Sequence, residues 1–199
     1  MRSVRVHALV NSSLIELKDE LMRPTSIEPK LLDRLVSIRR DLHCHPELSW
    51  KEERTQSQIA SHLDQLGLTY RKIAGTGLIV DMPGRGPKAP VIVLRADIDA
   101  LPVEEETGLP FASKNHGVMH ACGHDGHTAM LLGAAALIAT DSKREAPVRL
   151  LFQPAEETGD GAQRMIEEGA LDDVAMIFGG HVDRHYPLGT IIVTDGAVN

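Results

Sequence analysis

The stretch that decides the fold is Val91-Ile92-Val93-Leu94-Arg95-Ala96-Asp97-Ile98-Asp99. It begins as a short, continuous apolar run and ends in two carboxylates. Such a run is typical of a strand that is covered on both faces in a parallel sheet. Ligands of α/β sheets bind beyond the carboxyl ends of the strands. Asp97 and Asp99 therefore stand where a functional site is expected.

Outward from this strand, predicted strands and helices alternate along the chain. Buried strands are predicted at 148–152, 175–178 and 190–194, and a strand pair at 70–73 and 78–82. Helices are predicted at 27–42, 126–140 and 161–169. A further helix is predicted to begin after a capping box at 49–52 and to end at Leu66, with Gly67 as its C-terminal cap. This alternation predicts an α/β fold with a mostly parallel sheet flanked by helices. Residues 1–26 are expected to form an N-terminal extension, either a weak leader or an extra helix at 14–22, and they lack the apolar stretch of a signal peptide.

Composition excludes several classes of protein. The chain has 199 residues, 42% of them hydrophobic, which is typical of a globular fold and not of a disordered one. A net charge of -7 and 3% aromatic residues argue against a nucleic-acid partner. No apolar run approaches the roughly 18 residues that span a bilayer, so no membrane partner is expected. Two cysteines, Cys44 and Cys122, predict no disulfide framework and favour a reducing, cytoplasmic location.

Four polar segments are expected to meet at one edge of the sheet. Asp97 and Asp99 follow the first strand, Glu156-Glu157 the second and His181 the third, while Cys122 lies in a loop that opens a helix. A thiolate at a helix N-terminus has a lowered pKa and is a good metal ligand. Spacing alone does not choose among three neighbouring histidines, His120, His124 and His127.

The two adjacent acidic residues suggest two different chemical roles. Adjacent residues that leave a strand point in opposite directions, so one of Glu156 and Glu157 could bind a metal and the other a water molecule. Asp97 and Asp99 face the same way and could bind a metal or orient a ligand histidine. His185 could compete with His181 as a ligand.

The histidines around Cys44 invite a different interpretation. His43 and His45 flank this cysteine, but no second cluster of ligands accompanies them. Pro46 marks the end of a helix at this point. We therefore expect His43 and His45 to have a structural role at the helix terminus.

Several motifs in fixed order resemble a known family, the dinuclear metallo-amidohydrolases of the aminoacylase/carboxypeptidase superfamily. The resemblance covers about residues 32–199 and is greatest to the thiol-containing branch: hippurate hydrolase, N-acyl-amino-acid amidohydrolase and indole-acetyl-amino-acid hydrolase. The motifs are Arg39-Arg40-Asp41-Leu42-His43, Pro46-Glu47-Leu48, 95–102, Met119-His120-Ala121-Cys122-Gly123-His124-Asp125, Gln153-Pro154-Ala155-Glu156-Glu157 and Gly180-His181.

The resemblance implies a role for each matching residue. Cys122 would bridge two divalent metal ions, manganese or zinc with cobalt or nickel as further options, and His124, Glu157 and His181 would be further ligands. Glu156 would be the general base, and Asp99 a carboxylate that supports the ligands. Asp97 stands where other branches carry a ligating histidine.

The resemblance also implies the reaction. Two metals lower the pKa of a shared water molecule and polarise an amide carbonyl. Glu156 would take the proton of the attacking water and deliver it to the leaving amine. The substrate would be a small N-acyl amino acid, and the products a carboxylic acid and an amino acid.

The chain is shorter than members of that family, which are about twice its length. We therefore expect residues 27–199 to be the N-terminal part of the catalytic domain, without the lid that pairs subunits into homodimers. One alternative is a truncated, non-catalytic remnant that binds metal and needs its missing half. A further alternative is a thiol hydrolase that uses Cys122 with a nearby histidine.

Overall fold

The computed structural model describes residues 5–8, 27–86 and 89–193. The chain divides into two compact units, residues 1–28 with 183–199, and residues 29–182. Within the first unit, strands β1 (Arg5–Ala8) and β7 (Thr190–Val193) form a two-stranded parallel sheet. The helix predicted at 14–22 and the boundary after residue 26 lie outside the described residues and stay predictions.

The second unit is built on a five-stranded sheet with the order β2-β3-β5-β4-β6. Its strands are β2 (Arg71–Ile73), β3 (Gly77–Met82), β4 (Val91–Asp97), β5 (Val148–Gln153) and β6 (Val174–Gly179). β4 runs parallel to both β5 and β6, and β3 runs antiparallel to β2 and β5. The predicted α/β class with a mostly parallel sheet is confirmed.

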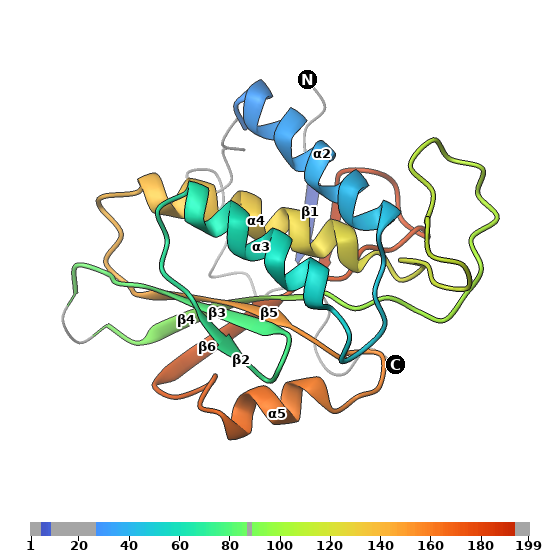
Figure 1. Cartoon of the computed structure of the whole chain (residues 1–199). Helices are drawn as coiled ribbons and strands as arrows, with labels where there is room; N and C mark the ends of the chain where they lie inside the picture. Colours follow the sequence, from blue (N-terminus) through green and yellow to red (C-terminus); the bar gives the residue numbers. More distant parts are fainter. Residues whose placement is uncertain (1–4, 9–26, 87–88, 194–199) are drawn as a thin grey trace. The chain divides into compact units, whose positions relative to one another are not determined.

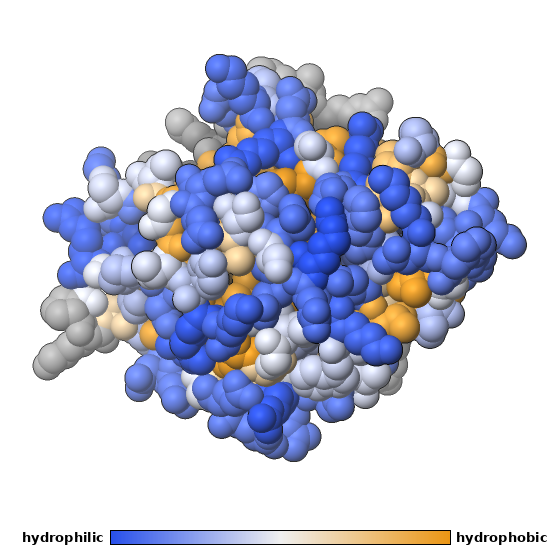
Figure 2. Space-filling view, viewed as in Figure 1, coloured by the Kyte–Doolittle hydropathy of each residue, from blue (hydrophilic) through white to orange (hydrophobic). Residues whose placement is uncertain are grey.

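Helices cover both faces of this sheet, as Figure 1 shows. Three of them, α2 (Pro29–Cys44), α3 (Glu53–Gln65) and α4 (His124–Thr140), lie on one face, and α5 (Gly161–Glu167) lies on the other. Alternate residues of β5 divide the core: Leu150 and Phe152 pack with α2, α3 and α4, while Leu151 packs with Met165 of α5. Hydrophilic residues predominate over the outer side of α3 (Figure 2). None of the helices within the described residues is long and apolar enough to cross a membrane.

Two strands differ from the expectation of burial. In β6, Met176, Ile177 and Phe178 are 50–53% exposed, because β4 is the only strand among the described residues that pairs with it. In β7, Ile191 and Ile192 are 51% and 43% exposed, and the strand pairs with β1 outside the main sheet. The strands predicted at 175–178 and 190–194 are present as β6 and β7, but the prediction that they are buried is wrong, since an apolar run does not specify its partners.

The N-terminus of α3 is capped by a different residue from the one predicted. The Glu47 carboxylate accepts hydrogen bonds from the backbone N–H groups of Arg54 (3.0 Å) and Thr55 (2.7 Å). Ser49 instead donates its hydroxyl to Asp99. The predicted capping box is wrong because the serine has a tertiary partner.

Candidate metal centre

The carboxyl ends of β4, β5 and β6 lie next to one another and position the site. Asp97 at the end of β4 pairs with Gln153 at the end of β5, and Arg95 pairs with Gly179 at the end of β6. The first turn of α4 begins at His124, beside these strand ends. The four segments that the sequence predicts to converge meet at this edge.

His124 is the centre of the cluster and is completely buried. Its Nδ1 lies 3.0 Å from the Asp99 carbonyl oxygen and 3.3 Å from Asp99 Oδ1, so Nδ1–H donates and Nε2 keeps its lone pair. That Nε2 lies 3.8 Å from one oxygen each of Glu156 and Glu157. Burial lowers the pKa of His124, but Asp99, Asp97 and Glu157 together raise it above its usual value.

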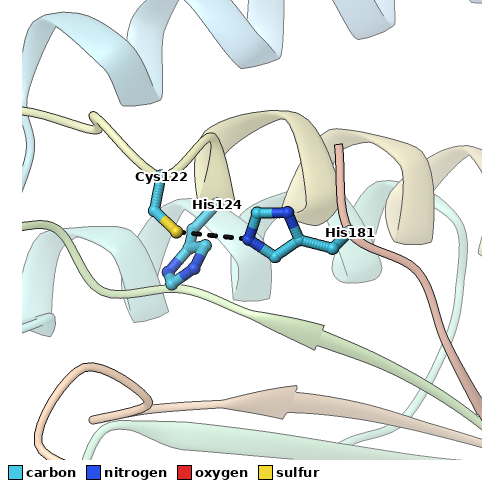
Figure 3. Close-up of side chains that lie close together, drawn as sticks. All are labelled: Cys122, His124 and His181. Carbon is cyan, nitrogen blue, oxygen red and sulfur yellow. Dashed lines mark hydrogen bonds between the residues drawn. The ribbon is translucent and has the colours of Figure 1, made fainter. Parts of the chain in front are cut away.

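Cys122 and His181 approach each other next to His124, as Figure 3 shows. The distance from Cys122 Sγ to His181 Nε2 is 3.2 Å. His181 Nδ1 lies 2.7 Å from the Val182 carbonyl oxygen and donates to it, which leaves Nε2 free to bind a cation. Both ligand-competent atoms therefore face the same space.

The Cys122 thiol does not have the lowered pKa that its position before a helix predicts. Burial raises its pKa to about 11, and the negative charges of Glu157, Glu156 and Asp97 act in the same direction. Burial and the carboxylates together outweigh the effect of the helix N-terminus on this pKa. A cation among them would reverse this balance.

Glu156 and Glu157 do not point in opposite directions, contrary to the expectation. They follow β5 in a turn, after Ala155 with a φ of +50°, and both carboxylates approach His124. The backbone N–H of Glu157 donates to Asp99 Oδ2 at 3.0 Å. Burial raises the pKa of Glu157. The turn replaces the alternation of a strand, so the two acids share one site.

The chemistry of these residues fits divalent metal ions. Ligand atoms of Cys122, His124 and His181 lie within 4.8 Å of one another, and so do those of His124, Glu156 and Glu157. His124 Nε2 and Glu157 Oε1 are buried with no hydrogen-bond partner among the described residues, a costly state that a bound cation relieves. Thiolate, imidazole and carboxylate donors suit zinc, manganese, cobalt and nickel.

Asp97 is engaged by other partners. Its Oδ1 lies 2.5 Å from Nδ1 of His127, and its Oδ2 lies 2.7 Å from Nη1 of Arg95. Burial alone would raise the pKa of Asp97, but the bond from His127 and the charges of His124 and Arg95 lower it. The carboxylate is thus held between an imidazole and a guanidinium.

Two supporting residues come from the turn before α3, where no sequence pattern indicates a functional role. Ser49 Oγ donates to Asp99 Oδ2 at 2.7 Å. The buried Glu52 carboxylate accepts the N–H of Ala155 at 2.8 Å and the hydroxyl of Thr76 at 2.6 Å. Through these hydrogen bonds, the turn holds Asp99 and the segment that carries Glu156 and Glu157 in position.

A second buried polar cluster lies where α2 and α4 pack together. His43 is in the last turn of α2, as expected, and its Nδ1 lies 2.8 Å from Asp125 Oδ2, which also accepts from Arg39. His120 is 4% exposed, its ring nitrogens have no hydrogen-bond partner among the described residues, and its ring centroid lies 6.4 Å from that of His43. Burial lowers the pKa of His120 to about 4, so it is neutral.

Two other histidines belong elsewhere. His45 Nδ1 lies 2.8 Å from the carbonyl oxygen of Asp41, within the end of α2. His185 belongs to the other unit, where its Nδ1 lies 2.6 Å from Asp183 Oδ1.

Comparisons with known proteins agree with the fold and the donor set. The model of peptidase family M20/M25/M40 matches residues 93–196, just over half of the chain. N-acetyl-L-cysteine deacetylase of Bacillus subtilis (strain 168) is 46% identical over 187 residues, which are 93% of this chain and 44% of that protein. IAA-amino acid hydrolase ILR1-like 6 of Arabidopsis thaliana is 46% identical over 175 residues, 87% of this chain and 37% of that protein.

A solved structure extends the similarity to three dimensions. The Bacillus subtilis YxeP protein, described as a dinuclear metal binding peptidase from the M20 family, superposes with a TM-score of 0.82 at 45% identity. The match covers 85% of this chain and 48% of that chain. The chain thus spans less than half the length of the relatives it matches.

Proposed function

Because the chain belongs to peptidase family M20/M25/M40, we propose that it holds two divalent metal ions at this site and hydrolyses the amide bond of small N-acyl amino acids. The observation that carries the proposal is the orphaned Nε2 of His124, buried among a thiol, a second imidazole and two carboxylates. The relatives named for N-acetyl-L-cysteine and for IAA-amino acids support this substrate class.

Cys122, His124, Glu157 and His181 are the residues that would hold the metal ions. Manganese or zinc fits these donors, and cobalt or nickel would also bind. When bound, the metals supply an activated water molecule and a polarised carbonyl. The homodimer that the resemblance implies for full-length members of the family stays a prediction, and so does a cytoplasmic location.

In the proposed reaction, Glu156 is the general base. Its side chain is 40% exposed, so substrate and water can reach it, and it lies beside the ligand His124. Glu156 takes a proton from the attacking water as the water oxygen bonds to the acyl carbon. It then gives that proton to the amine nitrogen as the carbon–nitrogen bond breaks, which yields a carboxylic acid and an amino acid.

Asp99 is proposed to act through its neighbours. It receives the Nδ1–H of His124 and the backbone N–H of Glu157, so it orients one ligand ring and one ligand-bearing turn. This arrangement keeps the Nε2 lone pair of His124 directed at the cation.

A second candidate function is metal binding without turnover. The observation that favours it is the donor cluster itself, since ligand atoms of Cys122, His124 and His181 lie within 4.8 Å of one another and suffice to bind a cation without a reaction. The thiol-hydrolase alternative has less support, because a Cys122 pKa of about 11 leaves little free thiolate at neutral pH.

The test compares two adjacent, isosteric substitutions. We expect about two metal ions per purified chain by elemental analysis, and chelator-sensitive hydrolysis of N-acetyl and N-benzoyl amino acids. Glu156→Gln should keep the metal and slow hydrolysis by about 100- to 10,000-fold. Glu157→Gln should lose metal as well as activity. Bound metal without turnover would establish the second candidate, and a chain that binds no metal would overturn both.

A further inference from the structure

His127 lies in the first turns of α4, next to the proposed ligands, and both of its ring nitrogens are engaged. It is 3% exposed. Its Nδ1 lies 2.5 Å from Asp97 Oδ1, and its Nε2 lies 2.9 Å from the backbone nitrogen of Val182. Asp97, His127 and His124 have ligand atoms close enough to hold a metal ion, so a ligand role for His127 must be weighed.

The backbone of Val182 decides the tautomer of His127. A backbone N–H can only donate, so Nε2 of His127 must carry the lone pair that accepts it. The ring proton is therefore on Nδ1, where it is donated to Asp97. A neutral imidazole has one nitrogen lone pair, and here it is already used. His127 has none left for a metal ion.

The same residue, Val182, is also held by His181. Nδ1 of His181 donates to the Val182 carbonyl oxygen at 2.7 Å, and this bond directs Nε2 of His181 toward Cys122 Sγ. The rings of His127 and His181 meet edge to face, with centroids 4.9 Å apart. The orientation of His181 thus depends on the position of Val182.

Gly123 allows Val182 to come this close. It has a φ of +89°, and a Cβ at this position would lie 2.5 Å from Cγ2 of Val182. The loop before α4 and the segment after β6 are therefore in direct contact. His127 adds a polar connection to this contact.

We propose that His127 is a positioning residue for His181: Asp97 fixes its tautomer, and its Nε2 holds the Val182 backbone that orients the His181 ring. This proposal depends on the proposed function in one respect only, that His181 is a metal ligand. It assigns Asp97 a role that reaches the cation only through His127, Val182 and His181.

Two amide substitutions separate positioning from ligation. In His127→Gln the amide reaches the place of Nε2 and can still accept from Val182 N–H. In His127→Asn the amide reaches only the place of Nδ1, so the bond to Val182 is lost. Loss of a partner that orients a metal ligand typically weakens metal affinity by about 10- to 100-fold.

The experiment titrates the full chain and both variants with Co²⁺, a spectroscopic probe. Near-ultraviolet absorption reports binding to the Cys122 thiolate, and the visible bands report the coordination of the ion. We expect the His127→Gln chain to bind Co²⁺ within about threefold of the unchanged protein, and His127→Asn to bind about 10- to 100-fold more weakly. Equal losses in both variants, or no loss in either, would overturn the proposal.

A second measurement does not depend on metal. The ¹⁵N chemical shifts of His127 in the metal-free chain should show a protonated Nδ1 and an unprotonated Nε2. The opposite tautomer would overturn the proposal, even if His127→Asn fails to fold. Failure of the proposed function would appear differently, as absent hydrolysis or absent metal with this tautomer unchanged.

Discussion

At the scale of single residues, Glu52 shows how a carboxylate outside the cluster supports it. Its side chain is completely buried and holds the N–H of Ala155, a residue with positive φ just before Glu156. Burial raises the pKa of Glu52 above its ordinary 4.5, although bonds from Thr76 and Ala155 oppose the shift. The buried negative charge is therefore tolerated at some cost in stability.

This cost predicts a pH dependence. Between the unfolded and the raised folded pKa of Glu52, the folded state binds more protons, so its contribution to stability falls as pH rises through that window. Glu52→Gln does not titrate; its amide oxygen can still accept the N–H of Ala155, and its amide NH2 can donate to the Thr76 hydroxyl in place of accepting from it. We expect its unfolding free energy, relative to the unchanged chain, to increase from acidic to neutral pH in urea titrations.

Two further variants sharpen the test of Glu52. Glu52→Ala should lower the unfolding free energy by about 1–3 kcal/mol, because the substitution leaves the Ala155 N–H buried without a hydrogen-bond partner. The exposed neighbour Glu53, changed to Gln, should show no such pH trend. A stability difference between Glu52→Gln and the unchanged chain that stays constant with pH would refute the interpretation.

How well the sequence predicts the role of a residue depends on how close its partners lie in the sequence. Cys122 and His124 are two positions apart, and Glu156 and Glu157 are adjacent, so their patterns are visible in the sequence. Ser49 and Glu52 act on residues 50 and 103 positions away, which no local pattern reveals. The sequence predicts a lowered pKa for the Cys122 thiol, but burial raises this pKa and three acids from other segments add to the rise, which no local pattern reveals.

At the scale of elements, apolar periodicity predicts the helices and strands of the second unit to within a few residues. For example, the helix predicted at 126–140 runs from His124 to Thr140. Gly67, with a φ of +69°, follows the end of α3 as predicted. Burial of β6 and β7 could not be predicted in this way, because it depends on which strand lies beside each of them.

The N-terminus of α3 gives a prediction for an element. Glu47 accepts two backbone N–H groups and the Thr55 hydroxyl there. Glu47→Ala should lower the unfolding free energy by about 0.5–2 kcal/mol, the usual range for a helix cap. Urea titrations would measure this, with Glu53→Ala in the same turn as a control. Equal effects of the two substitutions would show that Glu47 is not the cap.

At the scale of the whole molecule, β6 has an outer edge that pairs with no strand among the described residues. Met176, Ile177 and Phe178 are each about half exposed. Open edges with apolar side chains pair with other chains. We therefore expect the protein to associate as its concentration rises.

Size-exclusion chromatography with light scattering would follow this association. Phe178→Lys should shift the onset to higher concentration, since a charge on an edge strand opposes pairing. Leu32→Lys, at a residue of α2 that is 50% exposed, is the matched control and should have little effect. A protein that stays monomeric at all concentrations, or equal effects of the two lysines, would contradict this prediction.

The contact between Cys122 and His181 joins residues that are 59 positions apart. Chains are synthesised at about 5–20 residues per second, so roughly 3–12 seconds separate the appearance of the thiol from that of the imidazole. During biosynthesis the thiol and His124 are therefore made before the remaining ligands. Any cation captured in that interval would be held by an incomplete set of donors, and its final coordination would wait for the end of β6 to be translated.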